Sequence, residues 1–385
     1  MKKILFIIPS LETGGTVSSL SSIINNLQSH LSIDVFALSH DGNRKVTFSD
    51  RLLKRSFLIH AYNCSLLLES SIIKYAILII KVVKRICLIL HLNIEKIIYQ
   101  DFIKRQNRQY DYVVGFQEGS STLFASYYKN VKKIAWIHCD YSKYHKQGKE
   151  LQIYMGFDRI VCVSKYTGDK FKNIYPSLSK KVLSIHNLLD FQNIQQSSLV
   201  NIDDYRFQSN KFTIISVGRL HPVKRFEYIP DIAKALVDRG CDFRWYILGP
   251  VSSERVLSDL ENAIEANSVS KFVYYLGNKN NPYPYMAESD LLVSLSSTEA
   301  CPMIFNEARV LGVPILTTDF GSAFEFIDNG ENGIIVPFEE ITSTLEDLIN
   351  SYEKVEIIKS INDKVDYNRT IIDSIDKLFA GLDIL

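Results

Sequence analysis

Short apolar runs alternate with longer amphipathic segments along most of the chain. Residues 3–9 form the first run, residues 17–27 show a helical period, and residues 33–38 form the second run. Runs of this length predict buried strands, which we also expect at 112–116, 133–138, 159–164, 181–186, 212–217, 245–249, 271–276, 290–294, 314–318 and 333–337. Such strands, separated by helices, are typical of parallel sheets covered on both faces. The pattern therefore predicts an α/β fold.

The chain has 385 residues, enough for two domains of roughly 150–200 residues each. Residues 191–211 are polar and weakly periodic, and we expect them to link the two domains. The prediction is a Rossmann-like domain over 1–190, a second one over 212–365, and a C-terminal helix within 366–385 that packs back on the first domain. Two doubly wound domains that face each other across a cleft are the expected architecture.

The net charge of +1 gives no reason to expect a nucleic acid as partner. The two parts of the chain differ, however. Residues 1–150 hold 21 Lys+Arg and 11 Asp+Glu, a balance of +10, so residues 151–385, with 23 against 32, carry −9. A basic first part favours an anionic partner or surface for that part alone.

Basic charge and apolar character meet in the segment 66–108. Residues 51–110 hold 11 Lys+Arg and 3 Asp+Glu, while residues 72–92 are densely apolar. At about 100° per residue, four cations fall within roughly 60° of one another on a helix: Lys74, Lys81, Arg85 and Lys96. This stripe predicts contact with an anionic membrane leaflet. The alternative is a buried domain helix whose lysines reach outward to solvent.

The remaining features of the chain favour a cytoplasmic protein. Residues 1–10 begin like a signal peptide, but the apolar run is too short and suits a buried strand better. No charge-free apolar stretch of 18 residues predicts a transmembrane helix. The cysteines show neither zinc-ligand nor disulfide spacing, so we expect reduced thiols at Cys64, Cys87, Cys139, Cys162, Cys241 and Cys301.

Two glycine-containing loops carry candidate chemistry. Gly14 and Gly15 follow the first predicted strand and open a helix, where backbone N–H groups can approach an anion. The strand 212–217 runs into Gly218 and Arg219, and Lys224 follows five residues later. Arg and Lys at the carboxyl edge of a parallel sheet suit phosphate. The alternatives are a plain tight turn and a solvated basic loop.

A third candidate lies around the predicted helix 302–311. Pro302 suits its first position and Gly312 the position after its end. Glu299 precedes this helix and Glu307 lies in its second turn, and N–H groups of residues 300–304 offer a seat for a diphosphate. Two carboxylates beside that seat can accept hydrogen bonds from sugar hydroxyls. Taken alone, they could equally be a capping acid and a solvated acid.

Glu299 and Glu307 also carry a resemblance, because their spacing matches the EX7E motif of retaining GT-B glycosyltransferases. The chain resembles glycosyltransferase family 4 (glycosyl transferases group 1) at 216–219 with Lys224, 287–290, 307–314, 321–327 and 329–333. The likeness over 1–190 is limited to the glycine loop, 136–140, 162–164 and 186–190. Ala300 and Cys301 stand where the family usually has Gly-Phe, a departure that bears on sugar specificity.

The resemblance implies a role for each matching residue. Glu307 would bind the ribose of a nucleotide-sugar, Glu299 the transferred sugar, and Arg219 with Lys224 the diphosphate. His138 would line the cleft near the reactive carbon from the first domain, as a catalytic residue beside Arg219, Lys224 and Glu299. The donor-binding residues it implies are Gly15, Gly218, Arg219, Lys224, Glu299, Cys301, Pro302, Met303, Ile304 and Glu307.

The function implied is retaining, hexosyltransferase-type transfer from a nucleotide-sugar to a growing, lipid-linked cell-surface polysaccharide such as a capsule or O-antigen, at the inner membrane face. No DxD triplet occurs, and two cations with a helix dipole can stabilise the leaving group, so we expect no metal. The alternatives are a nucleotide-sugar epimerase of the GT-B fold and a catalytically silent scaffold. An epimerase would not predict the basic amphipathic segment, and the joint presence of Arg219, Lys224, Glu299 and Glu307 argues against silence.

Overall fold

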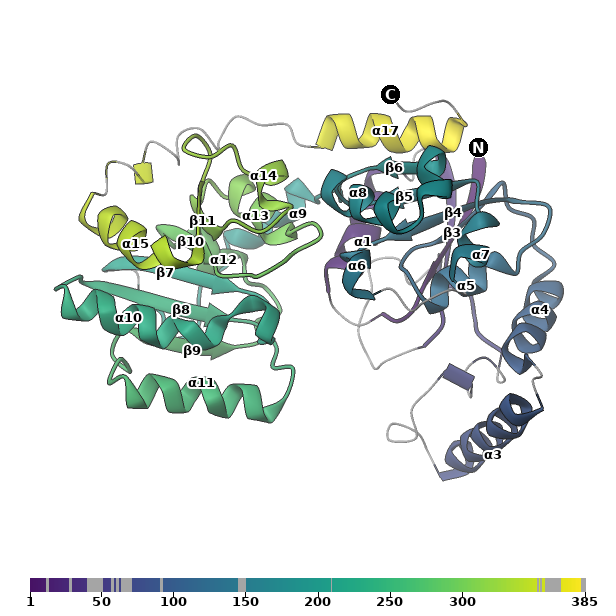
Figure 1. The fold of residues 1–385 in the computed structure, drawn as a ribbon, viewed down its shortest axis with the longest axis horizontal. Helices are drawn as coiled ribbons and strands as arrows, with labels where there is room; N and C mark the ends of the chain where they lie inside the picture. Colours follow the sequence, from purple (N-terminus) through teal and green to yellow (C-terminus); the bar gives the residue numbers. More distant parts are fainter. Residues whose placement is uncertain are drawn as a thin grey trace. The chain divides into compact units, whose positions relative to one another are not determined.

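A computed structural model describes residues 1–11, 14–27, 30–39, 51–56, 59, 62–63, 71–90, 93–144, 150–208, 210–351, 353, 355–356 and 368–381. The chain divides into two compact units (Figure 1). Unit 1 comprises Met1–Leu188 with Asn368–Leu385, and unit 2 comprises Leu189–Tyr367. Cys64 lies outside the described residues, and the other five cysteines are free thiols.

Unit 1 is built on a parallel sheet that, within the described residues, has the strand order β2-β1-β3-β4-β5-β6. The chain passes from β1 to β2 on one side and returns to place β3 on the other, so the strand order reverses between β1 and β3. The predicted strands are confirmed at β1 (Lys2–Ile8), β2 (Leu31–Ala37), β3 (Tyr112–Gly115), β4 (Lys132–Ile137), β5 (Arg159–Cys162) and β6 (Val182–Ser184).

Helices cover both faces of this sheet because its strands are apolar on both sides. Leu5, Ala135 and Ile160 belong to one buried cluster, which Phe124 and Phe171 of the helices complete. The helices are α1 (Gly15–Leu27), α3 (Ser71–Ile89), α4 (Ile94–Gln106), α5 (Ser120–Ser126), α6 (Tyr141–Tyr144), α7 (Glu150–Met155) and α8 (Lys165–Ile174).

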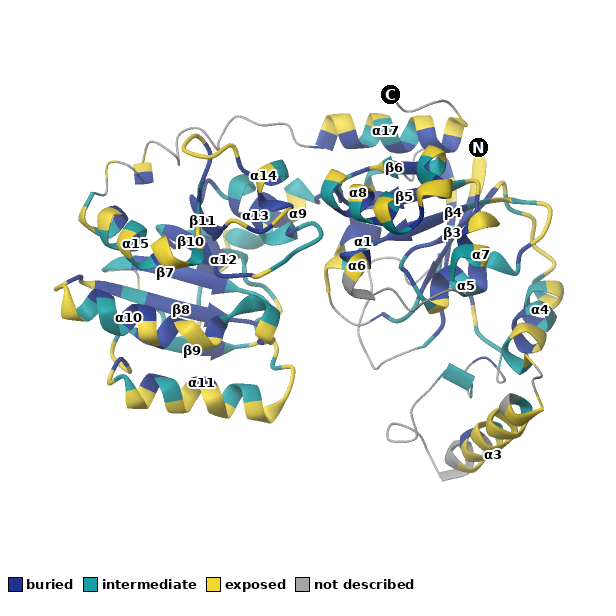
Figure 2. Ribbon diagram, viewed as in Figure 1, coloured by how far each residue is buried: buried dark blue, intermediate teal, exposed yellow. Residues whose placement is uncertain are grey.

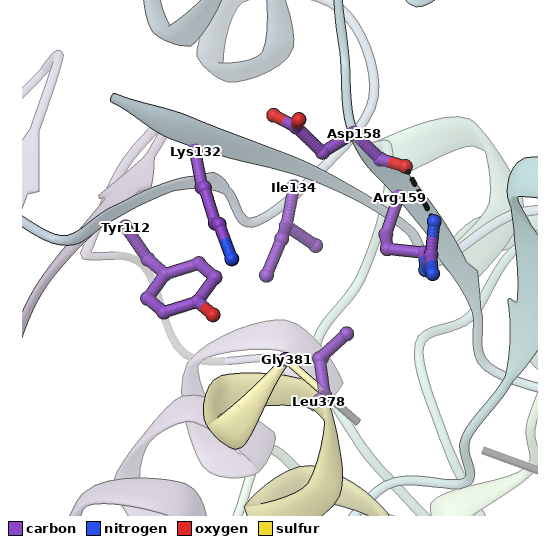
Figure 3. Close-up of a pocket in the computed structure, with 7 residues that line it drawn as sticks. All are labelled: Tyr112, Lys132, Ile134, Asp158, Arg159, Leu378 and Gly381. Atoms are coloured by element: carbon purple, nitrogen blue, oxygen red, sulfur yellow. Dashed lines mark hydrogen bonds between the residues drawn. The ribbon is translucent and has the colours of Figure 1, made fainter. Parts of the chain in front are cut away.

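The C-terminal helix α17 (Asn368–Ala380) also belongs to unit 1. Phe379 is buried, and its ring lies 6.2 Å from Phe6 and 5.3 Å from Tyr112 between centroids. Asp376 adds a 2.9 Å contact to the imidazole of His30. The helix ends at Gly381, which has the left-handed φ of 77° common after a helix and lies close to Tyr112 (Figure 3).

Unit 2 repeats the architecture, with the order β12-β11-β10-β7-β8-β9 among the described residues. Its strands confirm the prediction at β7 (Phe212–Val217), β8 (Phe243–Leu248), β9 (Val273–Gly277), β10 (Leu291–Ser294), β11 (Ile315–Thr318) and β12 (Ile334–Val336). Strand β8 begins two residues earlier than expected, because buried Phe243 pairs with Phe212 although Arg244 interrupts the apolar run. The helices are α9 (Phe191–Ser198), α10 (Ile229–Asp238), α11 (Glu254–Ala266), α12 (Tyr283–Ala287), α13 (Met303–Val310), α14 (Ala323–Phe326) and α15 (Ile341–Asn350).

The segment 191–211, expected as a linker, begins with helix α9, which is part of unit 2. Asp190 caps it by accepting a hydrogen bond from Asn193 N–H at 3.2 Å, and Ile194 is buried. Because α9 lies against α12 and α13, it packs on its own unit rather than bridging freely. Its single buried apolar residue left the helical pattern too weak to recognise.

The basic segment is two helices rather than one. Helix α3 ends at Ile89, and α4 begins after Asn93, whose side chain caps it through Lys96 N–H at 2.9 Å. Lys96 therefore does not share a helix with Lys81 and Arg85, and the predicted four-residue stripe is wrong. The side chain of Lys74 lies outside the described part of the chain. Most described side chains of α3 are exposed (Figure 2). In the part of the chain that the structure describes, no helix is long and apolar enough to cross a membrane.

Candidate active site

The carboxyl ends of β7 and β10 are adjacent in the unit 2 sheet, at the point where the strand order reverses. The loops that leave these two strands meet there, since Ser297 N–H donates to Val223 C=O at 2.9 Å. Open α/β sheets bind ligands at such a reversal, outside the carboxyl ends of their strands. The predicted residues 218–224 and 299–307 therefore share one edge of the sheet.

Two glycines provide the space that the first of these loops needs where it follows its strand. Gly218 follows β7, and its N–H donates to Leu248 C=O at 2.9 Å. Gly249 follows β8 with a φ of 142°, and a Cβ there would lie 1.8 Å from the Gly218 carbonyl oxygen. A Cβ on Gly218 would also press on Lys224 Cε at 3.2 Å. Glycine at both positions therefore shapes the loop that presents Arg219 and Lys224.

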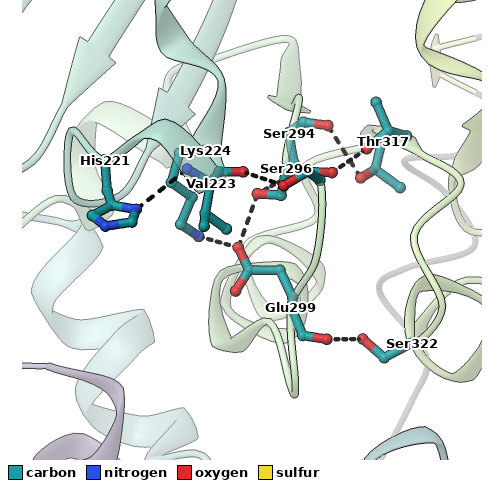
Figure 4. A network of polar contacts seen from close by, with 10 residues as sticks. His221, Val223, Lys224, Ser294, Ser296, Glu299, Thr317 and Ser322 are labelled. Atoms are coloured by element: carbon teal, nitrogen blue, oxygen red, sulfur yellow. Dashed lines mark hydrogen bonds and ion pairs between the residues drawn. The ribbon is translucent and has the colours of Figure 1, made fainter. Parts of the chain in front are cut away.

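Lys224 and Glu299 form an ion pair between Nζ and Oε1 at the centre of this edge (Figure 4). Both side chains are largely buried, with 22% and 18% of their surface exposed. Ser296 donates from Oγ to the same Oε1 at 2.8 Å, and Ser322 Oγ donates to the Glu299 carbonyl at 2.7 Å. The carboxylate is thus held by a cation and a hydroxyl before any ligand arrives.

Arg219 is exposed and forms no ion pair with any residue that the structure describes. Its loop is shaped locally by His221, whose Nδ1 accepts from Val223 N–H at 3.2 Å, and by Arg225, whose guanidinium lies 4.9 Å from the Phe338 ring centroid. Arg219 therefore keeps its planar set of donors available to an anion in solution.

Helix α13 begins at Met303, beside Glu299 in the chain. Pro302 is its N-cap residue rather than its first helical residue, because its ψ of 93° is extended. No side chain caps the helix, and its first N–H groups have no acceptor within the helix. The positive helix end thus lies next to the Lys224–Glu299 pair, with Cys301, Met303 and Ile304 partly exposed around it. Gly312, with a φ of 70°, follows the end of the helix as predicted.

Glu307 lies in the second turn of α13, apart from the ion pair. Tyr283 of α12 is its polar neighbour, with the hydroxyl 3.5 Å from Oε1. Burial raises the pKa of Glu307 to about 7, and the hydrogen bond from Tyr283 only partly opposes this. Asn306, the preceding residue, is fully buried, and its amide has no hydrogen-bond partner among the described residues.

The two remaining candidates, Gly15 and His138, belong to unit 1. Gly15 opens α1 after β1, and His138 follows β4, so both lie at the carboxyl edge of that sheet. The His138 N–H donates to Glu118 Oε2 at 2.9 Å, and its ring lies 4.6 Å from Phe116. Burial lowers the pKa of His138 to about 3, so the imidazole is neutral at physiological pH. Its Nε2 has no partner in the described part of the chain.

Three contacts at this edge went unpredicted. Ser296 lies three residues before Glu299, as a polar residue directly after a buried strand, and that position could have signalled it. Tyr283 reaches Glu307 from a separate helix, and Gly249 reaches Gly218 from a separate strand, so neither is visible in a linear motif. Among the residues described, no group of three or more His, Cys, Asp or Glu side chains could hold a metal ion.

Comparison with known proteins shows which family and which fold this architecture resembles. Residues 200–365, which hold the whole unit 2 edge, match the family described as glycosyl transferases group 1. The matched residues make up most of unit 2 and belong to that family. Its parallel sheets match the GT-B fold of Anabaena HepE, crystallised with UDP-glucose, at a TM-score of 0.71 and 16% identity over 99% of this chain and 100% of that one.

Curated members of the family are similar over different lengths. A Campylobacter jejuni protein, named N-acetylgalactosamine-N,N'-diacetylbacillosaminyl-diphospho-undecaprenol 4-alpha-N-acetylgalactosaminyltransferase, is 24% identical over 100% of this chain and 99% of its own. The Escherichia coli O-antigen biosynthesis glycosyltransferase WbnH is 28% identical over 51% of this chain and 52% of its own. This chain spans only 62%, 61% and 48% of the length of three other curated relatives.

The raised pKa of Glu307 predicts a pH-dependent stability. The folded protein holds the Glu307 proton up to about pH 7, whereas the unfolded chain releases it near the ordinary value of about 4.3. Between these values the folded state binds more protons, so this group's contribution to stability is present at low pH and is lost as the pH rises. Urea unfolding from pH 5 to 7.5 should therefore show Glu307→Gln gaining stability relative to wild type with rising pH. Glu288 is an exposed glutamate of the same unit, and Glu288→Gln should show no such trend. A pH-independent difference for Glu307→Gln would contradict the assignment.

Proposed function

We propose that the protein is a retaining, metal-independent glycosyltransferase that transfers a sugar from a nucleotide-sugar to a lipid-linked glycan. The observation that carries the proposal is the Lys224–Glu299 pair beside exposed Arg219 and the uncapped start of α13. Together they offer cations and N–H groups for a diphosphate, and a carboxylate for sugar hydroxyls, at one edge of one sheet.

Each residue takes one part of the donor. Arg219 and Lys224 bind the diphosphate, joined by the backbone N–H groups of Met303 and Ile304. Glu299 accepts hydrogen bonds from the transferred sugar, and Glu307 from the ribose. Because Lys224 is already paired with Glu299, the diphosphate competes for this cation, which frees the carboxylate for the sugar hydroxyls as the donor binds.

In the reaction, the bond between the anomeric carbon and the phosphate oxygen breaks while an acceptor hydroxyl bonds to that carbon on the same face. The acceptor proton passes to the departing phosphate. Negative charge grows on the diphosphate as the bond breaks, and Arg219 and Lys224 stabilise it more in the transition state than in the bound donor. From unit 1, Gly15 contributes backbone N–H groups to a phosphate, and neutral His138 lines the sugar site.

The names of two relatives support a lipid-linked acceptor in glycan assembly. The Campylobacter protein that aligns along the full chain is named for a diphospho-undecaprenol acceptor, and WbnH for O-antigen biosynthesis. We extend this acceptor class to the present chain and take a UDP-sugar as the first donor to test, because HepE was crystallised with UDP-glucose.

The proposal is tested by incubating the protein with UDP-, GDP- and ADP-sugars and lipid-linked acceptors, with and without EDTA. We expect one donor to yield a glycoside of retained anomeric configuration by NMR, at a rate that EDTA leaves unchanged. An inverted product, an epimerised free nucleotide-sugar, or activity lost to EDTA and restored by Mg²⁺ or Mn²⁺ would each contradict a part of it.

Arg219→Ala should chiefly lower kcat, by about 100-fold or more, because charge on the leaving phosphate grows in the transition state. Arg239→Ala is the matched control, since Arg239 is a partly exposed arginine of unit 2 paired with Glu346. Steady-state kinetics with the accepted donor decide the matter. Wild-type kcat in Arg219→Ala would remove this residue from the phosphate site.

We also propose that α3 holds unit 1 on an anionic membrane leaflet. Seven large apolar side chains of α3 are between 37% and 72% exposed: Tyr75, Leu78, Ile79, Val82, Val83, Ile86 and Ile89. At about 100° per residue they cover one arc of roughly 140°. Lys81 and Arg85 border this arc and are exposed, and α3 contains no acidic residue.

This arrangement suits a lipid surface better than water. An exposed apolar face of this length costs free energy in water and gains it at the headgroup boundary. Cations along its border meet anionic headgroups, and the acceptor proposed above would reside in that membrane. Lys84 has a partner within the protein, since its Nζ lies 4.2 Å from the Tyr62 ring centroid.

Vesicle binding should separate the contribution of the two cations from that of the apolar arc. Lys81→Gln with Arg85→Gln should weaken binding to anionic vesicles roughly 30-fold, from about 1 kcal/mol per cation near the surface. Ile79→Glu with Ile86→Glu should abolish it at any salt concentration, because the apolar arc no longer inserts. Lys129→Gln with Lys180→Gln removes two exposed lysines elsewhere in unit 1 and should leave binding unchanged. Co-sedimentation at low and high salt measures all four proteins, and absence of wild-type binding would end the proposal.

A further inference from the structure

A cavity of about 140 Å³ lies in unit 1 under the C-terminal end of α17 (Figure 3). Its floor is formed by residues at the amino ends of β3, β4 and β5, among them Tyr112, Lys132 and Arg159. Gly15 and His138 lie at the carboxyl ends of strands in the same sheet. The cavity is therefore at the opposite edge from the residues that the proposed transfer uses.

The polar groups of this cavity are donors. Lys132 Nζ lies 5.6 Å from the Tyr112 ring centroid and forms no ion pair with any carboxylate in the described ranges. Tyr112 is only 4% exposed, and its hydroxyl has no hydrogen-bond partner among the described residues. Arg159 donates from Nη1 to the Asp158 carbonyl at 3.2 Å and carries a guanidinium with several N–H groups.

The one acid in the lining is not paired with Lys132. Asp158 accepts a hydrogen bond from Lys133 N–H at 2.7 Å through Oδ2. Figure 3 shows its carboxyl group directed away from Lys132, on the other side of the strand. The cavity thus presents Lys132 and a phenol hydroxyl, with no carboxylate directed at Lys132 from the lining, and Arg159 lies at its border.

The remaining residues of the lining set the size and shape of the cavity. Ile134 and Leu378 are apolar. Gly381 borders the cavity with a φ of 77°, and a Cβ there would lie 3.3 Å from Lys132 Nζ and 3.5 Å from the Tyr112 hydroxyl. Glycine at this position keeps space open in front of both donors. The volume is large enough to admit a small oxyanion.

We propose that this cavity is a binding site for a small phosphate group, either inorganic phosphate or the phosphoryl end of a small metabolite. Lys132 supplies a point charge, Arg159 planar donors and Tyr112 a hydroxyl, while Ile134 and Leu378 contact the ligand's apolar side. The ligand lies between the sheet and α17, so its binding strengthens the docking of that helix on unit 1.

The consequence for the fold follows from linkage. Only the conformation with α17 docked has both walls of the cavity, so a bound phosphate stabilises that conformation in proportion to the logarithm of its concentration over Kd. Helix α17 follows unit 2 in the chain and packs on unit 1. The site would therefore regulate the attachment of the C-terminal segment rather than the chemistry.

The test uses hydrogen exchange of the α17 amides in the full chain, with inorganic phosphate or glycerol phosphate titrated at constant ionic strength. The readout is confined to α17 of unit 1, and Arg219→Ala with Lys224→Gln serves as the background, so that phosphate binding at the proposed donor site in unit 2 is weakened. We expect exchange in α17 to slow as either probe is added, and Lys132→Gln to raise the apparent Kd about tenfold or more. A response to glycerol phosphate alone would assign the site to phosphorylated metabolites.

Lys133→Gln is the matched control, because Lys133 is the next residue of β4 and its Nζ lies 5.9 Å from the Phe157 ring centroid, in the core cluster on the other face of the sheet. It should leave the titration unchanged. Tyr112→Phe keeps the ring that packs on Phe379 and should weaken binding by a smaller factor than Lys132→Gln. No slowing with either probe, or equal effects of Lys132→Gln and Lys133→Gln, would overturn the proposal whatever the outcome for glycosyl transfer.

Discussion

The backbone hydrogen bond from Ser297 to Val223 is the contact on which the unit 2 site depends. It joins the loop after β7 to the loop after β10 where the order of the parallel strands reverses. Open α/β sheets bind ligands at such a point, outside the carboxyl ends of their strands. A cation from one loop and a carboxylate from the other can pair there only because the sheet places their strands side by side. The chemistry of the site is therefore a consequence of strand order.

This dependence explains which parts of the site the sequence could predict. Glu299 and Glu307 lie close in the chain, one before and one within a short helix, and their spacing matches a motif of a known family. The glycine after β7, Arg219 and Lys224 follow a recognisable buried strand. Lys224 pairs with Glu299 across 75 residues, however, and the partner becomes evident only once β7 and β10 are known to be neighbours. The same holds for Tyr283 beside Glu307, which comes from a helix with no motif of its own.

The fold was predictable for a different reason. Strands buried on both faces are continuous apolar runs, and such runs mark all twelve described strands regardless of their partners. Helix α9 shows where prediction from apolar patterns fails, because a helix with one buried apolar residue has almost the composition of a linker. Helix α3 shows the opposite limit. Its apolar residues look like those of a core helix in the sequence, yet the structure leaves them exposed, and only the cations on the border of the face distinguish the two cases.

The two edges of the unit 1 sheet have different physical characters, and this limits what a ligand can do at each. At the carboxyl edge, the start of α1 and the buried, neutral His138 suit a reacting group, because N–H groups and a neutral imidazole are already fixed in place. At the amino edge, Lys132 and Tyr112 face a helix that the chain reaches only after unit 2 is complete. A ligand there touches α17 and no residue of the proposed reaction. Its free energy of binding can therefore change how firmly the C-terminal segment is held, while the residues of the proposed transfer lie elsewhere.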